Sequence, residues 1–375
     1  MAGTTLKGHE ISALTGIRAV MAYWVVCHHL LPVDAELAPL FLLVARGAIG
    51  VDVFFILSGF ILAYTYQNRH ISDRAFWLLR AARIYPVYLL GMILFTPFIL
   101  LNLTELHSSM TGVAVRVLVY GVTTLLLVQA WLPQLALAWN GPGWSLSAEA
   151  FFYALFPFVL RILKSRPLAF TVGVARLCYV LYLVPHAIFQ TLPESVAGDY
   201  QSILFATFNP LIRLPEFIIG MCLARFLLNG HGRIVARFTF MILIAFLAVT
   251  SLIENEIVFR ALAPLLICLL LTALFFGGGL IGRILAFRPM VELGHASYAV
   301  YILHIPVAYW FHWMTIGNPK AIFTIPDIAF YLVILTALAL LSYRYIERPS
   351  NEALRQRFVT GDGRQAAPAV RRHLA

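Results

Sequence analysis

The residues best suited to chemistry lie in the first apolar run, residues 12–32, where Arg18 and His29 interrupt a hydrophobic sequence. They are eleven positions apart, and at about 100° per residue such positions share one helix face, about 16 Å apart along the axis. A charge at the centre of a bilayer costs about 2.5–3.5 kcal/mol, so it normally faces a bundle interior or a cavity. We expect this face to line a polar chamber. The alternative is an Arg18 that snorkels to the interface and a His29 that caps the outer end.

Asp52 lies near the start of the second apolar run, at a depth comparable to that of His29 on an antiparallel helix. A carboxylate beside an imidazole fixes its tautomer and strengthens it as a base. Asp52 is therefore a candidate partner for His29, and a helix-capping role is equally compatible with its position.

Two arginines, Arg80 and Arg83, precede the third apolar run and are three positions apart. Both would project from one face of a helix. Guanidinium groups bind phosphate through paired, charge-assisted hydrogen bonds, so this pair could hold a phosphorylated ligand. The alternative is that both arginines only anchor the helix at the membrane surface.

Ser145, Glu149 and Tyr153 are spaced by four and form a polar stripe on an otherwise apolar helix. A buried carboxylate is costly unless it is used or satisfied, which favours a functional role. Ser145 could instead cap the start of this helix. Arg213 and Glu216 are three apart and should pair within the bundle, either structurally or to bind an acceptor.

A third stripe, Ser297, Tyr301 and His304, follows from spacings of four and three. We interpret His304 as a helix histidine whose polar groups are satisfied rather than as a second base. The four cysteines lie inside apolar runs without the spacing of a metal site or a disulfide, so we expect no metal.

The composition is that of a multi-span membrane protein, because 61% of the residues are hydrophobic and only 12% are charged. The net charge of +10 is spread over short connectors between apolar runs, which is typical of orientation signals. A lipid bilayer is therefore an expected partner, and nucleic acid is not.

Eleven apolar runs can be distinguished, and the charges of the connectors decide which of them cross the membrane. If residues 113–132 do not cross, every strongly basic connector falls on one side, with both termini in the cytoplasm. This predicts an all-α, polytopic membrane helix bundle of about ten transmembrane helices, in which 113–132 is re-entrant or lies along the outer interface. Residues 1–350 would form one domain, and 351–375 a basic tail that is disordered or lies loosely at the cytoplasmic surface.

Together these motifs resemble the integral-membrane acyltransferase type 3 family, whose members O-acylate sugars of bacterial polysaccharides, lipopolysaccharide and antibiotics. The resemblance covers residues 11–355. It is carried by Arg18-x10-His29, Gly50-Val-Asp52-Val-Phe-Phe, Leu57-Ser58-Gly59-Phe60, Arg80-x-x-Arg83-Ile-Tyr85-Pro86, Trp144-Ser145-x3-Glu149-x3-Tyr153, Ser297-Tyr298 with Tyr301-x-x-His304, and Glu347-Arg348-Pro349.

The resemblance implies an O-acyltransferase of a bacterial inner membrane that moves an acyl group, most simply acetyl from acetyl-CoA, to a hydroxyl at the outer side. The donor would be acyl-CoA and the acceptor a carbohydrate or a glycosylated small molecule; the oligomeric state stays open. The implied catalytic residues are His29, Asp52 and Glu149, the donor-binding residues Arg18, Arg80, Arg83 and Tyr85, and the acceptor-binding residues Ser145, Tyr153, Arg213 and Glu216.

The competing interpretation is a transporter or flippase, in which the ionisable groups within the membrane form a substrate pathway. Against it, the sequence shows neither an internal repeat nor paired broken helices. Binding of acyl-CoA would separate the two classes.

Overall fold

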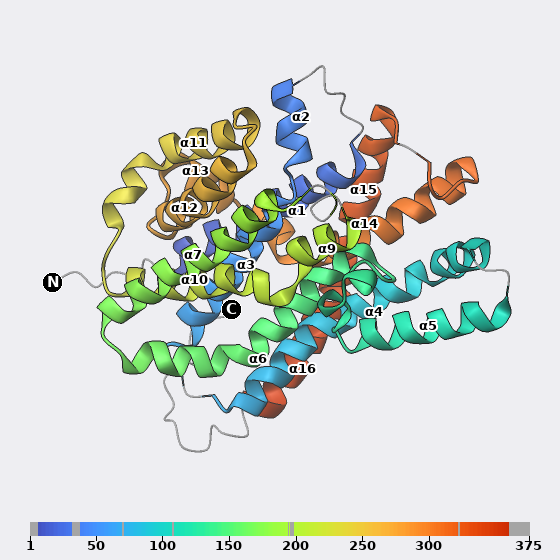
Figure 1. Cartoon of the computed structure of the whole chain (residues 1–375). Helices are drawn as coiled ribbons and strands as arrows, with labels where there is room; N and C mark the ends of the chain where they lie inside the picture. Colours follow the sequence, from blue (N-terminus) through green and yellow to red (C-terminus); the bar gives the residue numbers. More distant parts are fainter. Residues whose placement is uncertain are drawn as a thin grey trace.

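The computed structural model describes residues 7–31, 38–69, 71–106, 109–193, 195, 199–321 and 323–359. Within these ranges all regular structure is helical, which confirms the predicted all-α class (Figure 1).

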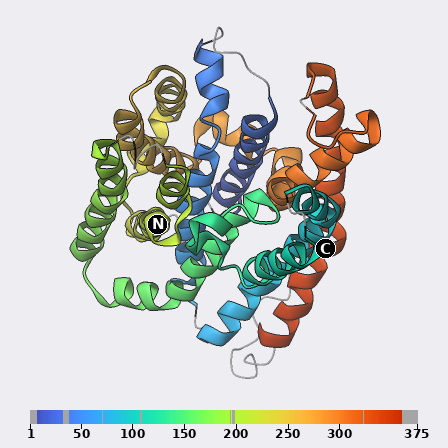
Figure 2. The same cartoon turned by 45° about the vertical axis from the view of Figure 1, so that its right-hand side comes forward.

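Two pairs of helices form the centre of the bundle. α1 (Lys7–Leu30) packs along α14 (Arg288–Ile316), and α3 (Ile49–Tyr66) packs along α10 (Pro210–Leu228) (Figures 1 and 2). The start of α10 follows from its sequence, because the Asn209 side chain accepts a hydrogen bond from the Leu211 amide and Pro210 occupies the first turn.

Glycines allow α3 and α10 to approach closely. A Cβ atom added at Gly59 would lie 1.9 Å from the carbonyl oxygen of Phe217, and one added at Gly220 would lie 1.9 Å from that of Ile56. Each glycine therefore sits directly against the backbone of the other helix. This is how small residues bring membrane helices together.

The other helices surround this centre. They are α2 (Ala38–Ala45), α4 (Asp73–Leu106), α5 (Met110–Leu125), α6 (Trp144–Ser165), α7 (Leu168–Thr191), α9 (Tyr200–Phe208), α11 (Thr239–Leu252), α12 (Glu256–Phe275), α13 (Gly279–Leu285), α15 (Ile325–Ser342) and α16 (Arg348–Val359).

Seven stretches of the described chain are long and apolar enough to cross a membrane, and they fall on α3, α4, α6, α7, α11, α12 and α15. This confirms a polytopic membrane bundle. The long helices α1, α10 and α14 lie outside this set. They carry polar residues that the sequence analysis singled out, such as Arg18, Arg213 and His304. With them the count would reach the expected ten, which stays a prediction.

The expected non-crossing segment 113–132 falls on α5 and the turns that follow it. α5 has 16 residues and lies beside the C-terminal half of α4 (Figure 2). At 1.5 Å per residue it is about 24 Å long, shorter than a hydrocarbon core of about 30 Å. Short 3₁₀ turns at Gln129–Trp131, Pro133–Leu135 and Gly141–Gly143 then lead to α6.

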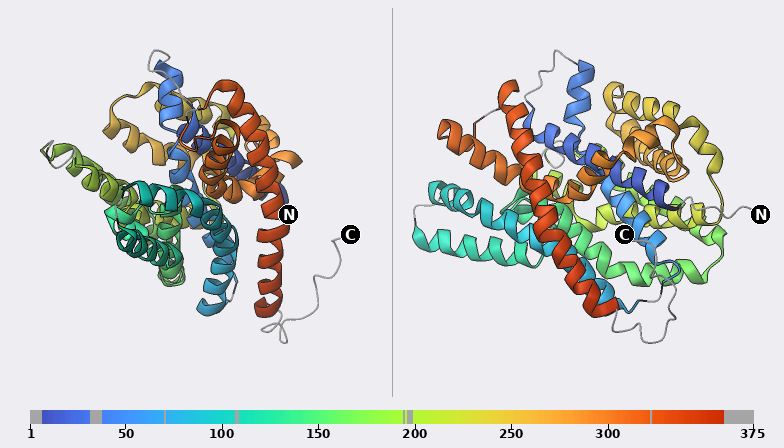
Figure 3. Two further views of the ribbon diagram at one scale, coloured as in Figure 1. Left: turned by 90° about the vertical axis from the view of Figure 1, so that its right-hand side faces the viewer. Right: turned by 180° about the vertical axis from the view of Figure 1, so that it is seen from behind.

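The tail was expected from residue 351, disordered or loosely held at the cytoplasmic surface, and in the structure residues 351–359 are helical. A π-helical turn, Tyr343–Glu347, joins α15 to α16, and α16 runs beside α4 (Figure 3). Because α16 packs on a neighbouring helix, it gains stability that its polar composition does not suggest. Residues 360–375 of the predicted tail lie outside the described residues.

Candidate active site

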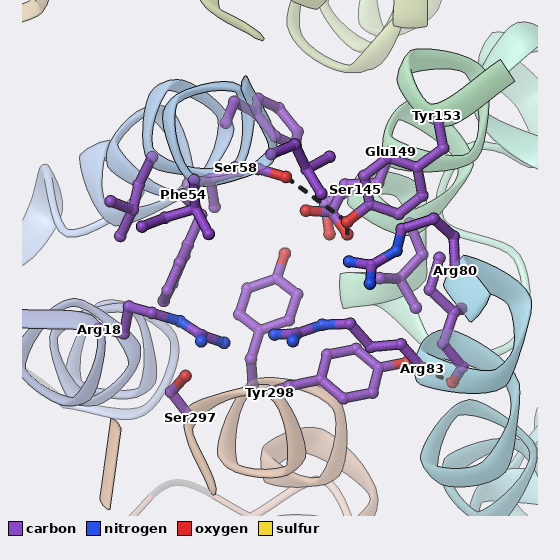
Figure 4. Close-up of a pocket in the computed structure, with 18 residues that line it drawn as sticks. Arg18, Phe54, Ser58, Arg80, Arg83, Ser145, Glu149, Tyr153, Ser297 and Tyr298 are labelled. Carbon is purple, nitrogen blue, oxygen red and sulfur yellow. Dashed lines mark hydrogen bonds between the residues drawn. The ribbon is translucent and has the colours of Figure 1, made fainter. Parts of the chain in front are cut away.

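A cavity of about 130 Å³ lies between α1, α3, α4, α6 and α14 (Figure 4). Its charged lining residues are Arg18 from α1, Arg80 and Arg83 from α4, and Glu149 from α6. Three helices far apart in the sequence, α1, α4 and α6, therefore bring together charged residues that were expected to act in one reaction.

The three arginines converge on the cavity, with the guanidinium groups of Arg18 and Arg83 pointing toward one another (Figure 4). The spacing of three places Arg80 and Arg83 on one face of α4, as predicted. Against three cationic groups, Glu149 is the one carboxylate among the described lining residues. Facing cations in a confined site favour an anionic ligand between them.

The predicted polar stripe of α6 also reaches the cavity. The Tyr153 hydroxyl donates a hydrogen bond to Glu149 Oε2 at 3.1 Å and lies 3.5 Å from Ser58 Oγ (Figure 4). Ser145 lines the same space, and its hydroxyl donates to the Pro142 carbonyl at 3.0 Å. Since α6 begins at Trp144 with Gly143 as its N-cap residue, Ser145 does not cap the helix.

Two tyrosines of α14 complete the wall, and sequence reasoning gave neither of them a role. Tyr298 donates to the Ile84 carbonyl at 2.6 Å, and Tyr301 donates to the Pro142 carbonyl at 3.3 Å. The spacing of Ser297 and Tyr301 had indicated a shared face. The spacing could not show that this face of α14 borders a cavity, because that depends on how α14 packs on α1.

His29 lies beyond this cavity. Among the described residues that line it, Arg18 is present and His29 is not. The exposed His29 side chain places Nδ1 2.9 Å from the Val25 carbonyl, and its ring centroid lies 5.0 Å from that of buried His304. The ring of Tyr301 is 6.0 Å from that of His304. Tyr301 lines the cavity and is thus linked to His29 through His304, whereas His29 is absent from the lining that includes Arg18.

Asp52 has a partner other than His29. It accepts a hydrogen bond from Arg213, whose Nε lies 3.1 Å from Glu216 Oε2. All three side chains are buried at the contact of α3 with α10. Pairing of Arg213 with Glu216 was expected, whereas the third member comes from a helix more than 150 residues earlier in the sequence.

Tyr85 points away from the cavity and donates to the Leu125 carbonyl at 2.9 Å. It therefore ties α4 to the end of α5. Its predicted contact with the donor has no counterpart in this arrangement.

Known proteins with similar sequences are acyltransferases, which fits the arrangement of charged residues in the cavity. Residues 11–344 match the family profile of an acyltransferase domain, that of acyltransferase 3. The chain is 31% identical to acyltransferase MdmB of Streptomyces mycarofaciens over 81% of this chain and 80% of the relative. It is 28% identical to the putative peptidoglycan O-acetyltransferase YrhL of Bacillus subtilis, and 24% identical to O-acetyltransferase OatA of Staphylococcus aureus.

The last two alignments cover 90% of this chain but only 54% and 57% of the relatives. The chain thus spans little more than half the length of these two proteins. No solved structure matches significantly. The profile match covers most of the sequence and includes every residue that lines the cavity, and the chain therefore belongs to the acyltransferase 3 family and is a membrane O-acyltransferase.

Proposed function

We propose that the enzyme transfers an acyl group, most simply acetyl, from acyl-CoA on the cytoplasmic side to a hydroxyl of a sugar or glycan on the outer side. In this step the hydroxyl oxygen attacks the thioester carbonyl carbon. The carbon–sulfur bond breaks, and the hydroxyl proton passes through a base to the CoA thiolate. The transport alternative has no comparable support, since the family is one of acyltransferases.

The observation that carries this proposal is the excess of cationic over anionic groups in the cavity. Arg18, Arg80 and Arg83 line the cavity with one carboxylate, Glu149, and buried Glu347 interacts with Arg18 and Arg83 without lining it, so the cationic groups still outnumber the anionic ones. At about 130 Å³ the cavity is smaller than the roughly 300–1,000 Å³ of typical ligand pockets, too small for a whole acyl-CoA molecule. We therefore assign the acyl thioester end of the donor to the cavity and leave its nucleotide outside. The arginines would then meet the negative charge that develops on the thioester oxygen during transfer, not a ligand that is charged from the start.

The lining groups suit the developing charge of acyl transfer. A tetrahedral intermediate places a negative charge on the former carbonyl oxygen, and preorganised donors stabilise it. The arginines are such donors in the cavity wall, whereas the hydroxyl hydrogens of Ser145 and Tyr153 are already donated to the Pro142 carbonyl and to Glu149. Glu149 would orient the Tyr153 hydroxyl through the 3.1 Å hydrogen bond. We assign the role of general base to His29, which is exposed and could meet an acceptor from outside.

We assign Asp52, Arg213 and Glu216 a structural role in place of the catalytic and acceptor-binding roles suggested by the resemblance. A buried ion pair at a helix contact is compatible with fixing α3 against α10. The carboxylate of Asp52 is already occupied by a guanidinium.

One relative supports an acceptor of the glycan class, because it is named as a putative peptidoglycan O-acetyltransferase. We propose a bacterial inner-membrane location with both termini in the cytoplasm. This follows from the distribution of basic connectors.

The test is transfer of label from acetyl-CoA carrying a radiolabelled acetyl group, in membranes of source cells that produce either the wild type or His29→Ala in place of the native protein. The wild type should label a glycan or glycoside fraction. His29→Ala should lose at least about 10²-fold of this activity at an equal protein level, the usual contribution of a general base. Near-normal labelling by His29→Ala would remove His29 from the mechanism.

A further inference from the structure

A second cavity, which the proposed function leaves unused, lies at the end of helices that also line the first one. It has a volume of about 420 Å³ and lies where α3 ends, α4 begins and α6 ends. Its described lining includes Tyr66 and Arg69 at and after the end of α3, Asp73 at the start of α4, and Arg161 and Lys164 near the end of α6. This volume falls within the roughly 300–1,000 Å³ of typical ligand pockets, so the second cavity can take a group that the first cannot.

The two cavities follow one another along α4 and α6. Phe76 of α4 and Phe156 of α6 line the second cavity, and they lie about one helical turn from Arg80 and Tyr153, which line the first. The ring centroid of Phe76 lies 5.8 Å from the guanidinium carbon of Arg80 and 6.4 Å from the ring centroid of Tyr153. A single layer of side chains therefore separates the two cavities.

Cationic groups also outnumber carboxylates in the second cavity. Arg69, Arg161 and Lys164 line it with one described carboxylate, Asp73. Arg161 Nη1 donates to both oxygens of Asp73, at 2.8 and 2.9 Å, so the charges of this pair compensate each other. Arg69 and Lys164 have no ion-pair partner within the described part of the chain, and both are exposed. Two uncompensated cations at one pocket favour a ligand that carries several negative charges.

Arg80 provides a polar group beside the layer that separates the cavities. Its Nε atom is buried and has no hydrogen-bond partner among the described residues. A buried donor without a partner is costly, which favours a ligand that accepts its hydrogen. Amide carbonyls are such acceptors, and the pantetheine arm of acyl-CoA carries them.

We propose that the second cavity binds the 3′-phosphorylated ADP group of acyl-CoA, an inference that rests on acyl-CoA as the proposed donor. Arg69 and Lys164 bind its phosphate groups through charge-assisted hydrogen bonds. The pantetheine arm then passes Phe76 and Arg80 and brings the thioester into the first cavity. In the proposed topology the basic connectors face the cytoplasm, which is the side from which acyl-CoA arrives.

The test removes the two charges and measures binding of the nucleotide half of the donor. Radiolabelled acetyl-CoA is bound to the full-length protein in lipid nanodiscs and displaced by adenosine 3′-phosphate 5′-diphosphate, which lacks the pantetheine arm. This nucleotide should displace acetyl-CoA from the wild type. In Arg69→Gln/Lys164→Gln we expect the affinities for acetyl-CoA and for the nucleotide both to fall about ten-fold or more. In the labelling assay the KM for acetyl-CoA should rise, with kcat within about two-fold of wild type.

The matched control is Arg74→Gln/Arg166→Gln, which removes the same charge from exposed residues outside the described lining. It should bind acetyl-CoA within about two-fold of wild type. An equal loss in the two double variants, an unchanged affinity of Arg69→Gln/Lys164→Gln, or no displacement by the nucleotide from the wild type would overturn the inference. A wild type that binds no acetyl-CoA at all would instead refute the proposed donor, so the two failures give different results.

Discussion

At the scale of residues, helical spacing predicted which side chains line the cavity better than it predicted which side chains pair across two helices. The stripes Arg80/Arg83 and Ser145/Glu149/Tyr153 reach one cavity because a spacing of three or four keeps side chains on one face. The same rule places Tyr85 about 200° around α4 from Arg83, and the structure confirms that it faces elsewhere. Spacing says nothing about the opposing helix, so it could not reveal that Asp52 meets Arg213.

Replacement of Asp52 should act on stability. In Asp52→Ala the buried Arg213 keeps one carboxylate neighbour, Glu216, and loses the other. Removing one partner of a buried ion pair costs about 3–5 kcal/mol, so the thermal unfolding midpoint of the purified protein should fall clearly. An unchanged midpoint together with lost acyl transfer would contradict this assignment and restore Asp52 as a catalytic carboxylate.

At the scale of elements, the sequence predicted which segments are helices but not which of them touch. Gly59 lies within an apolar run of the sequence, and the structure shows it against the backbone of α10. The reciprocal contact of Gly220 could not be predicted. It depends on the register between two helices that no spacing within either one encodes.

The two glycines make the contact of α3 with α10 testable. Gly220→Val would place side-chain atoms where the Ile56 carbonyl lies, so the helices must separate and the midpoint of thermal unfolding should drop strongly. Gly173→Ala on α7 is the control, because a Cβ there meets no atom within 4 Å. Equal midpoints for Gly220→Val and the wild type would show that the helices do not touch as described.

At the scale of the whole molecule, composition alone identified a membrane bundle, because apolar stretches of this length have few other uses. The distribution of basic connectors then favoured ten crossing segments over eleven, with residues 113–132 not crossing. The end of the chain was less predictable, since the polar composition of residues 351–359 suggested disorder and only packing on α4 explains their helix.

The orientation can be checked with a fluorescent reporter that matures only in the cytoplasm. Fusions after Gly230 and after Ala375 should fluoresce, and a fusion after Asn255 should not, because basic connectors stay inside. If α5 crossed the membrane, every later connector would change sides. Fluorescence after Asn255 and none after Gly230 would therefore refute the non-crossing α5.

The most direct test of the central claim is equilibrium binding of radiolabelled acetyl-CoA to the purified full-length protein in lipid nanodiscs. The account predicts saturable binding by the wild type and a loss of affinity of about ten-fold or more in Arg18→Gln and in Arg83→Gln, since each removes a charged donor from the cavity. Arg288→Gln, an exposed arginine of α14 paired with Glu292, should bind as the wild type does. Absence of binding, or equal affinity in all four proteins, would contradict the account.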